Sequence, residues 1–279
     1  MAPRAHDPVA VFDSGVGGLT VLHELLVSLP SEDYLYLGDT ARFPYGDRSQ
    51  DELRAFAVEI AEHLLDEGAK LLVVACNAAS SAALPLLTHN LADSGREIDV
   101  IGVVAPATQL AVAGSRTGRI GLLATPATVA SGAYERAVYT ADPHVHLESV
   151  ACPDLASIIE GGFPFDEQVV QTVRDSCAPL RAAEVDTVIL GCTHYPLIAP
   201  MLQRILGRGV AFVTSGASVA RSVERALAAR GLLNPQQHEG AYRFQCTADV
   251  ESFRALGTRF LQMPLGEVRH VALSERLAA

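Results

Sequence analysis

Short, continuously apolar runs rich in β-branched residues alternate along this chain with longer segments in which apolar residues recur at helical spacing. In the segment 49–67, the residues that share one helical face are Leu53, Phe56, Ile60 and Leu64. Strands that are apolar along their whole length are buried on both faces, which is typical of a parallel sheet covered by helices on both sides. The alternation therefore predicts an α/β fold.

The expected elements can be placed by residue number. We expect strands at 8–12, 34–38, 70–75, 99–104, 119–123, 146–150, 186–190, 210–213 and 242–246. Helical patterns cover 49–67, 166–182 and 216–230. The strand-to-cysteine units at 70–80 and 186–196 resemble each other. We therefore predict two related domains, each a mostly parallel sheet flanked by helices, with the active site in the cleft between them. The first domain would comprise 1–98 plus 210–279, and the second 99–209.

Two of the five cysteines directly follow predicted strands. Cys76 ends the run LLVVAC, Cys192 ends VILGC, and both are followed by polar side chains: Asn77 and Ser80 after the first, Thr193 and His194 after the second. Ligands of parallel sheets bind beyond the carboxyl ends of the strands. We expect each of these cysteines to open a helix, whose positive N-terminus favours the thiolate. The other cysteines, Cys152, Cys177 and Cys246, are interpreted as buried structural residues.

A pair of thiols without a redox partner suits proton transfer on both faces of one carbon atom. One thiol removes a proton and the other supplies one from the opposite side, and a thiol with a reference pKa of about 8.5 can take either role. His194, beside Cys192, would steer protons. The expected donors to substrate carboxylates are backbone N–H groups and the side chains of Ser14, Asn77, Thr125 and Thr193. The residues alone predict a cofactor-independent two-thiol racemase or epimerase.

Other classes of function have weaker support. The stretch DSGVGG at 13–18 lacks the lysine of a P-loop and the spacing of a dinucleotide site. Its glycines predict a tight strand-to-helix turn that needs glycine's conformational freedom, whereas Asp13 and Ser14 would face the cleft. No GxSxG serine-hydrolase motif occurs, and one CxH pair is thin evidence for zinc, so we expect neither metal nor cofactor.

The net charge and the cysteines limit which binding partners and which cellular compartment are expected for this protein. A net charge of −11 argues against nucleic acid and against an anionic membrane surface. Five cysteines without a CxxC pair fit reduced thiols better than a disulfide framework. The first residues contain no signal-peptide core, and no apolar run reaches membrane-spanning length. We expect a cytoplasmic protein that acts on a small molecule.

Five motifs in this order resemble the glutamate racemases of the aspartate/glutamate racemase superfamily. They are VFDSGVGGLTVL, YLGDTARFPYGDRS, VVACNAAS, TPATVASGAY and LGCTHYPLI, and together they extend the resemblance over nearly the whole chain. The resemblance implies interconversion of L- and D-glutamate without pyridoxal phosphate or metal, and a supply of D-glutamate for peptidoglycan. It also implies a cytoplasmic enzyme that often forms homodimers.

The resemblance further implies roles for individual residues. Cys76 and Cys192 match the catalytic thiols that act on D- and L-glutamate respectively. Asp13 and His194 match residues that assist the first and the second thiol, and Glu160, in CPDLASIIEGG, matches a functional glutamate. The substrate-binding positions fall on Asp13, Ser14, Tyr45, Gly46, Asn77, Ala78, Thr193 and His194. Ala78 stands where the family usually has a hydroxyl residue, so one donor to a substrate carboxylate is missing.

Two alternatives remain open from the sequence. The same fold could act on aspartate, hydantoin or another small acid, as a racemase or as a one-thiol decarboxylase, although the second cysteine argues against decarboxylation. A non-catalytic binding protein that retains the cleft belongs to another class. Exchange of the Cα proton of glutamate distinguishes these alternatives from glutamate racemisation.

Overall fold

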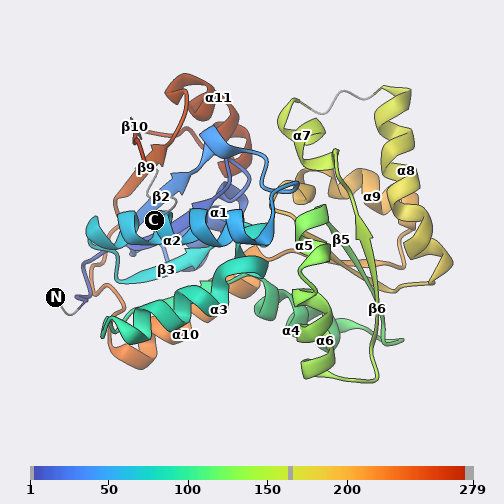
Figure 1. Cartoon of the computed structure of the whole chain (residues 1–279), viewed down its shortest axis with the longest axis horizontal. Coiled ribbons are helices and arrows are strands. Elements are labelled where there is room, and N and C mark those ends of the chain that lie inside the picture. The colour runs from blue at the N-terminus through green and yellow to red at the C-terminus, as the bar shows by residue number, and fades with distance from the viewer. Residues whose placement is uncertain (1–2, 163–165, 274–279) are drawn as a thin grey trace.

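Two parallel sheets, one in each lobe of the molecule, form the framework of the chain (Figure 1). The computed structural model describes residues 3–162 and 166–273. The strands of the first sheet are β1 (Val9–Asp13), β2 (Tyr34–Gly38), β3 (Leu71–Val74), β4 (Asp99–Gly102), β9 (Tyr242–Cys246) and β10 (Val268–His270). Those of the second are β5 (Arg119–Ala124), β6 (His146–Ala151), β7 (Thr187–Gly191) and β8 (Ala211–Val213).

The strand orders are β10-β9-β2-β1-β3-β4 and β6-β5-β7-β8, and every pairing is parallel. The carboxyl ends of β1 and β3 therefore meet at one edge of the first sheet, because Phe12 pairs with Val74. In the second sheet Ala124 of β5 pairs with Gly191 of β7. The residues that follow these four strands are the ones predicted to carry the site.

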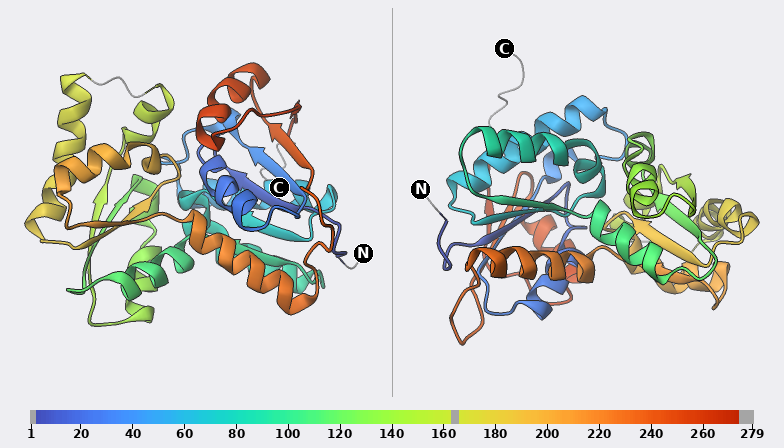
Figure 2. Two further views of the ribbon diagram at one scale, coloured as in Figure 1. Left: turned by 180° about the vertical axis from the view of Figure 1, so that it is seen from behind. Right: turned by 90° about the horizontal axis from the view of Figure 1, so that it is seen from below.

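Helices cover both faces of the sheets. They are α1 (Leu19–Ser28), α2 (Gln50–Asp66), α3 (Asn77–Asp93), α4 (Val104–Gly114), α5 (Pro126–Ala130), α6 (Ala133–Ala141), α7 (Leu155–Glu160), α8 (Glu167–Ala182), α9 (Ala199–Leu206), α10 (Gly216–Arg230) and α11 (Val250–Leu261). Two short 3-10 helices, η1 (Thr40–Arg42) and η2 (Tyr195–Ile198), follow β2 and β7. Figure 2 shows α10 packed along the underside of the first lobe, where the chain returns from the second.

Alternate residues of β1 face opposite sides of the first sheet. Val9 and Val11 pack in one core cluster with residues of α1, α10 and α11, whereas Ala10 and Phe12 pack in another with residues of α2 and α3. The first cluster continues into the second lobe, where it includes residues of α7, α8 and α9. This shared apolar core holds the two lobes against each other.

The α/β fold with two parallel, helix-flanked sheets is confirmed. All nine predicted strands form to within about two residues at each end, and so do the helices predicted at 49–67, 166–182 and 216–230. The prediction missed β10, since two of its three residues are exposed and it is too short to show a pattern.

The chain passes from one sheet to the other a few residues from the predicted domain boundaries. β4 begins at Asp99 and pairs with β3, so residues 99–102 belong to the first sheet. Residues 211–213 pair with β7 and belong to the second sheet. Residues 1–2, 163–165 and 274–279, which the predicted domains included, lie outside the described residues.

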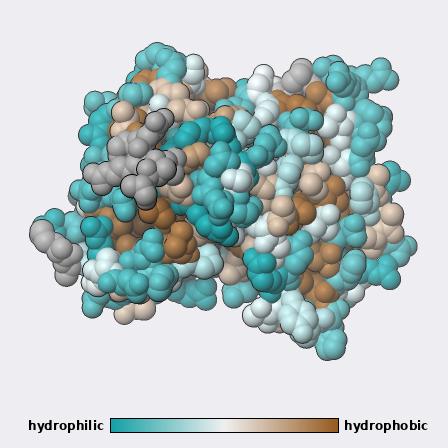
Figure 3. Space-filling model, viewed as in Figure 1, coloured by the Kyte–Doolittle hydropathy of each residue, from teal (hydrophilic) through white to brown (hydrophobic). Residues whose placement is uncertain are grey.

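Most of the surface on the face shown in Figure 3 is polar, as expected when the apolar side chains form a buried core. Hydrophilic residues predominate on the face shown in Figure 3, and hydrophobic residues form separate patches on it. The large apolar side chains that are exposed among the described residues are Val27, Leu110, Tyr139 and Leu233.

Candidate active site

A narrow cavity lies where the loops after β1, β2, β3, β5 and β7 converge. Ten of the predicted site residues line it: Ser14, Tyr45, Gly46, Cys76, Asn77, Ala78, Thr125, Cys192, Thr193 and His194. The free volume is about 20 Å³, enough for about one water molecule. The walls must therefore move apart to admit a molecule as large as an amino acid.

The two cysteines come from different lobes. Cys76 follows β3 and is the residue immediately before α3, and Cys192 follows β7. Both side chains are almost completely buried, and both are free thiols. Each lobe thus contributes one thiol to a single cavity.

The prediction that both cysteines begin helices is only half right. Cys76 is the N-cap of α3, whereas the short η2 begins at Tyr195 with His194 as its N-cap, and Cys192 meets it only through the Tyr195 N–H, which donates to the Cys192 carbonyl at 3.2 Å. Nor is the thiolate favoured, because burial raises the pKa of the Cys76 thiol to about 12 and that of Cys192 well above its usual value. Desolvation outweighs the backbone dipoles here, so both groups are neutral thiols at pH 7.

Asp13 lies behind the cavity wall and not on it. Its side chain is completely buried and accepts hydrogen bonds from the Gly15 N–H at 3.0 Å and from the Thr193 hydroxyl at 3.3 Å. Burial raises its pKa, and its negative charge contributes to the raised pKa of Cys76. A carboxyl group of raised pKa is a better proton acceptor than an exposed one.

Glu160 also lies behind the residues that line the cavity, where its carboxylate contacts the imidazole of His194. His194 Nε2 lies 2.8 Å from Glu160 Oε2, and His194 Nδ1 lies 3.9 Å from the sulfur of Cys192. The imidazole also contacts two aromatic rings, Phe43 at 5.7 Å and Phe260 at 5.0 Å between ring centroids, the second edge-on. Glu160 is therefore a structural neighbour of the second thiol through His194.

The glycines of DSGVGG serve a purpose different from the predicted one. None of Gly15, Gly17 and Gly18 has a positive φ, so the turn does not require glycine's conformational freedom. A Cβ atom at Gly17 would lie 2.3 Å from Thr193 Oγ1 and 2.5 Å from His194 Nδ1. One at Gly18 would lie 2.5 Å from the Cβ of Asp13. Gly17 therefore allows the start of α1 to touch site residues of the other lobe, and Gly18 allows it to pack closely on Asp13 of its own lobe.

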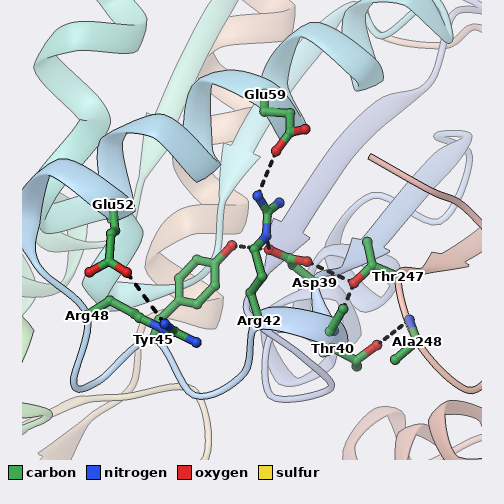
Figure 4. A network of polar contacts seen from close by, with 10 residues as sticks. Asp39, Thr40, Arg42, Tyr45, Arg48, Glu52, Glu59, Thr247 and Ala248 are labelled. Atoms are coloured by element: carbon green, nitrogen blue, oxygen red, sulfur yellow. Dashed lines mark hydrogen bonds and ion pairs between the residues drawn. The ribbon is translucent and has the colours of Figure 1, made fainter. Parts of the chain in front are cut away.

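A polar network holds the loop that carries Tyr45 and Gly46, as Figure 4 shows. The buried carboxylate of Asp39 accepts hydrogen bonds from the hydroxyl of Tyr45, from Arg42 Nε at 2.6 Å and from Thr247 Oγ1 at 2.8 Å. Arg42 also donates to Glu59 of α2 at 2.6 Å. The Tyr45 hydroxyl is occupied by Asp39, so this residue offers the cavity its ring and its backbone.

The same loop is attached to the second lobe. The carbonyl of Gly46 accepts a hydrogen bond of 2.8 Å from the N–H of Ala127, at the start of α5. A Cβ at Gly46 would lie 3.0 Å from the Cβ of Thr125. Glycine at this position thus allows the two cavity walls to approach closely.

Several residues near the site were missed by sequence reasoning. Phe43, Pro44, Pro153 and Ala156 line the cavity, and Tyr134 of α6 donates a hydrogen bond of 2.6 Å to the side-chain oxygen of Asn77. Tyr134 lies inside the motif TPATVASGAY, but nothing in its local pattern indicates a partner on another lobe. Apolar cavity walls carry no distinct sequence signal either.

Neither a metal cluster nor a membrane-spanning helix occurs in the part of the chain that the structure describes. Among residues 3–162 and 166–273 there is no group of three or more His, Cys, Asp and Glu side chains that could hold a metal ion. In the same part of the chain, no helix has the length and apolar character needed to cross a bilayer.

Comparisons with known proteins agree on one family. The model of the Asp/Glu/Hydantoin racemase family matches residues 20–223. A glutamate racemase of Bacillus cereus is 39% identical over 267 residues, which are 96% of this chain and 97% of that protein. The structure of glutamate racemase isoform RacE1 from Bacillus anthracis has a TM-score of 0.91 at 37% identity and covers 97% of this chain and 99% of its own.

A third relative was solved with a ligand. The structure of glutamate racemase from Francisella tularensis, in complex with D-glutamate, has a TM-score of 0.88 at 32% identity. It covers 96% of this chain and 98% of its own. The similarity therefore extends over both lobes.

Proposed function

The chain belongs to the Asp/Glu/Hydantoin racemase family, and we propose that it interconverts L- and D-glutamate with the two cavity thiols as acid and base. The observation that carries this proposal is that Cys76 and Cys192 come from different lobes and line the same cavity. Racemisation needs a base on one face of the α-carbon and an acid on the other. A pair of free thiols on separate walls meets that requirement.

The reaction balances within this pair. A thiolate takes the α-proton on one face of glutamate and leaves a planar carbanion, and the opposite thiol then delivers its proton to the other face. The first sulfur ends as a thiol and the second as a thiolate. Following the family resemblance, Cys76 deprotonates D-glutamate and Cys192 deprotonates L-glutamate.

The raised pKa values define what else the site must do. Both sulfurs hold their protons at neutral pH, so one proton must leave before that sulfur can act as a base. We assign this task to Asp13 for Cys76 and to His194 for Cys192, with Glu160 holding the imidazole. The raised pKa of Asp13 and the 3.9 Å separation of His194 Nδ1 from the sulfur of Cys192 support this assignment.

Neutral donors bind the substrate carboxylates in this proposal. Ser14, Asn77, Thr125 and Thr193 line the cavity, and backbone N–H groups near Tyr45 and Gly46 supplement them. Such preorganised dipoles stabilise negative charge without adding a cation. Ala78 supplies no hydroxyl, so its contribution is limited to the backbone.

The relatives are glutamate racemases, which supports glutamate as the substrate. Supply of D-glutamate for peptidoglycan and the cell wall follows from that activity. We further propose a cytoplasmic enzyme that pairs as a homodimer and binds neither nucleic acid nor membranes. Five free thiols and a net charge of −11 support the compartment and the absence of such partners.

Isotope exchange in deuterated water tests the proposed function. L- or D-glutamate incubated with the enzyme should acquire deuterium at Cα and lose optical activity. A parallel rate measurement with aspartate tests substrate preference, and we expect glutamate to react faster. A purified, folded protein that exchanges the Cα proton of neither amino acid would contradict the proposal.

A further inference from the structure

One hydrogen bond crosses between the lobes to a side chain of the cavity wall. Tyr134, on α6 in the second lobe, is completely buried, and its hydroxyl donates to the side-chain oxygen of Asn77 at 2.6 Å. Asn77 opens α3 in the first lobe directly after Cys76. The length of the bond indicates a strong contact between two buried groups.

The other end of the same amide has no protein partner. Asn77 is 97% buried, and its Nδ2 has no hydrogen-bond partner among the described residues. A buried N–H group without a partner is costly, so it is usually found where a ligand or a water molecule satisfies it. Since Asn77 lines the cavity, its free amide group is available to a substrate carboxylate.

An asparagine side chain can present either its oxygen or its nitrogen, and the two choices have opposite effects on an anion. The oxygen repels a carboxylate, whereas the N–H₂ group donates to it. A phenol is a better donor than acceptor, so Tyr134 selects the orientation in which the amide oxygen turns back toward α6. The nitrogen is then the end left for the cavity.

We propose that Tyr134 is a positioning residue for substrate binding, which orients the Asn77 amide so that its N–H₂ group meets a carboxylate of glutamate. This inference rests on the proposed function. The orientation of Asn77 would also depend on the contact between the lobes, because the orienting bond exists only while α6 and the start of α3 are together. Opening of the narrow cavity would release the amide, and closure would set it.

The test removes one hydroxyl group. In Tyr134→Phe the KM for both enantiomers of glutamate should rise about tenfold while kcat changes by less than about threefold. Tyr139→Phe is the matched control, because Tyr139 lies on the same helix with 71% of its surface exposed. We expect the control to keep the wild-type KM and kcat.

A double-mutant cycle separates positioning from general support of the fold. In the Asn77→Ala background, Tyr134→Phe should raise KM by less than about twofold, because the amide that it orients is gone. A structural role would instead lower the thermal midpoint and leave the KM of the folded enzyme unchanged. The inference is overturned if Tyr134→Phe matches the Tyr139→Phe control in KM, or if its effect is as large without the Asn77 amide as with it.

A second variant covers the case in which Tyr134→Phe does not fold. Asn77→Asp keeps an acceptor for Tyr134 but turns a carboxylate oxygen toward the cavity, so its KM should exceed that of Asn77→Ala by about tenfold or more. Equal KM values for these two variants would refute the proposed orientation. An inactive wild-type enzyme would refute the proposed function, whereas an active wild type with an unaffected Tyr134→Phe variant refutes this inference alone.

Discussion

Gly17→Ala adds one methyl group to the place where the two lobes touch. The new Cβ would lie 2.3 Å from Thr193 Oγ1 and 2.5 Å from His194 Nδ1, whereas ordinary contacts between such atoms begin near 3.4 Å. Thr193 and His194 would have to retreat by about 1 Å to relieve the overlap. Because Thr193 donates to Asp13 and His194 lies beside Cys192, the shift would disturb the partners of both thiols.

Two quantities follow from this displacement. Overpacking a buried contact by one methyl group costs about 1–3 kcal/mol of the free energy of unfolding. In a chain of this size that corresponds to a fall in the thermal midpoint of about 2–4 °C for each kcal/mol. A displacement of about 1 Å in catalytic groups costs about 100-fold in rate, so kcat/KM for glutamate should fall about 100-fold in both directions.

Circular dichroism measures the rate of racemisation starting from each enantiomer, and the thermal unfolding of the same preparations gives their stability. Gly114→Ala is the matched control, because nothing lies within 4 Å of a Cβ at that position and its backbone is helical. It should keep full activity and gain slightly in stability. A Gly17→Ala enzyme that folds and retains wild-type kcat/KM would refute the argument that close approach, and not turn geometry, requires glycine here.

Three further predictions concern the thiols and the fold. Cys76→Ser and Cys192→Ser should each lower kcat by about 100-fold or more, measured from both enantiomers, and undiminished turnover in either would contradict the assigned roles. The Cys76 thiol has a pKa of about 12 in the fold against an ordinary value of 9.0, so the folded protein keeps this proton after the unfolded chain has lost it. Urea unfolding should therefore show stability falling as pH rises from 9 toward 12, and less steeply in Cys76→Ser; equal slopes would speak against a buried thiol. Asp186→Ala removes the acceptor for the hydroxyl of Ser115 at 2.7 Å and for two backbone N–H groups, and should cost about 2–4 kcal/mol in urea unfolding without changing KM; an unchanged unfolding midpoint would argue against this contact.

The positions of most secondary-structure elements follow from local patterns in the chain. The α2 prediction over 49–67 depended on apolar residues at helical spacing, and a capping box between Ser49 and Glu52 marks its start in the structure. β10 left no such pattern, because neighbouring strand β9 and not its own sequence holds it in the sheet. Helical and strand periodicity are local properties, so one sequence is enough to find them.

Most of the residues that line the candidate site could be predicted from the sequence, but the contacts behind them could not. Ten of the named residues line one cavity because parallel strands bring their carboxyl ends to one edge, which the strand assignments already imply. Asp13 and Glu160 were named as well, yet their places behind the wall depend on how deeply each loop is packed. The Asp39 network and the Tyr134–Asn77 bond had no local signal.

By itself the sequence determined the α/β class, the order of strands and helices along the chain, and the presence of two cysteines at strand ends. Tertiary structure alone decided that Gly17 touches His194, that Tyr134 reaches Asn77, and that both thiols are almost completely buried, which raises their pKa values. The reason is that periodicity and turn chemistry act between near neighbours in the chain. Desolvation and close contact arise only when distant segments pack together.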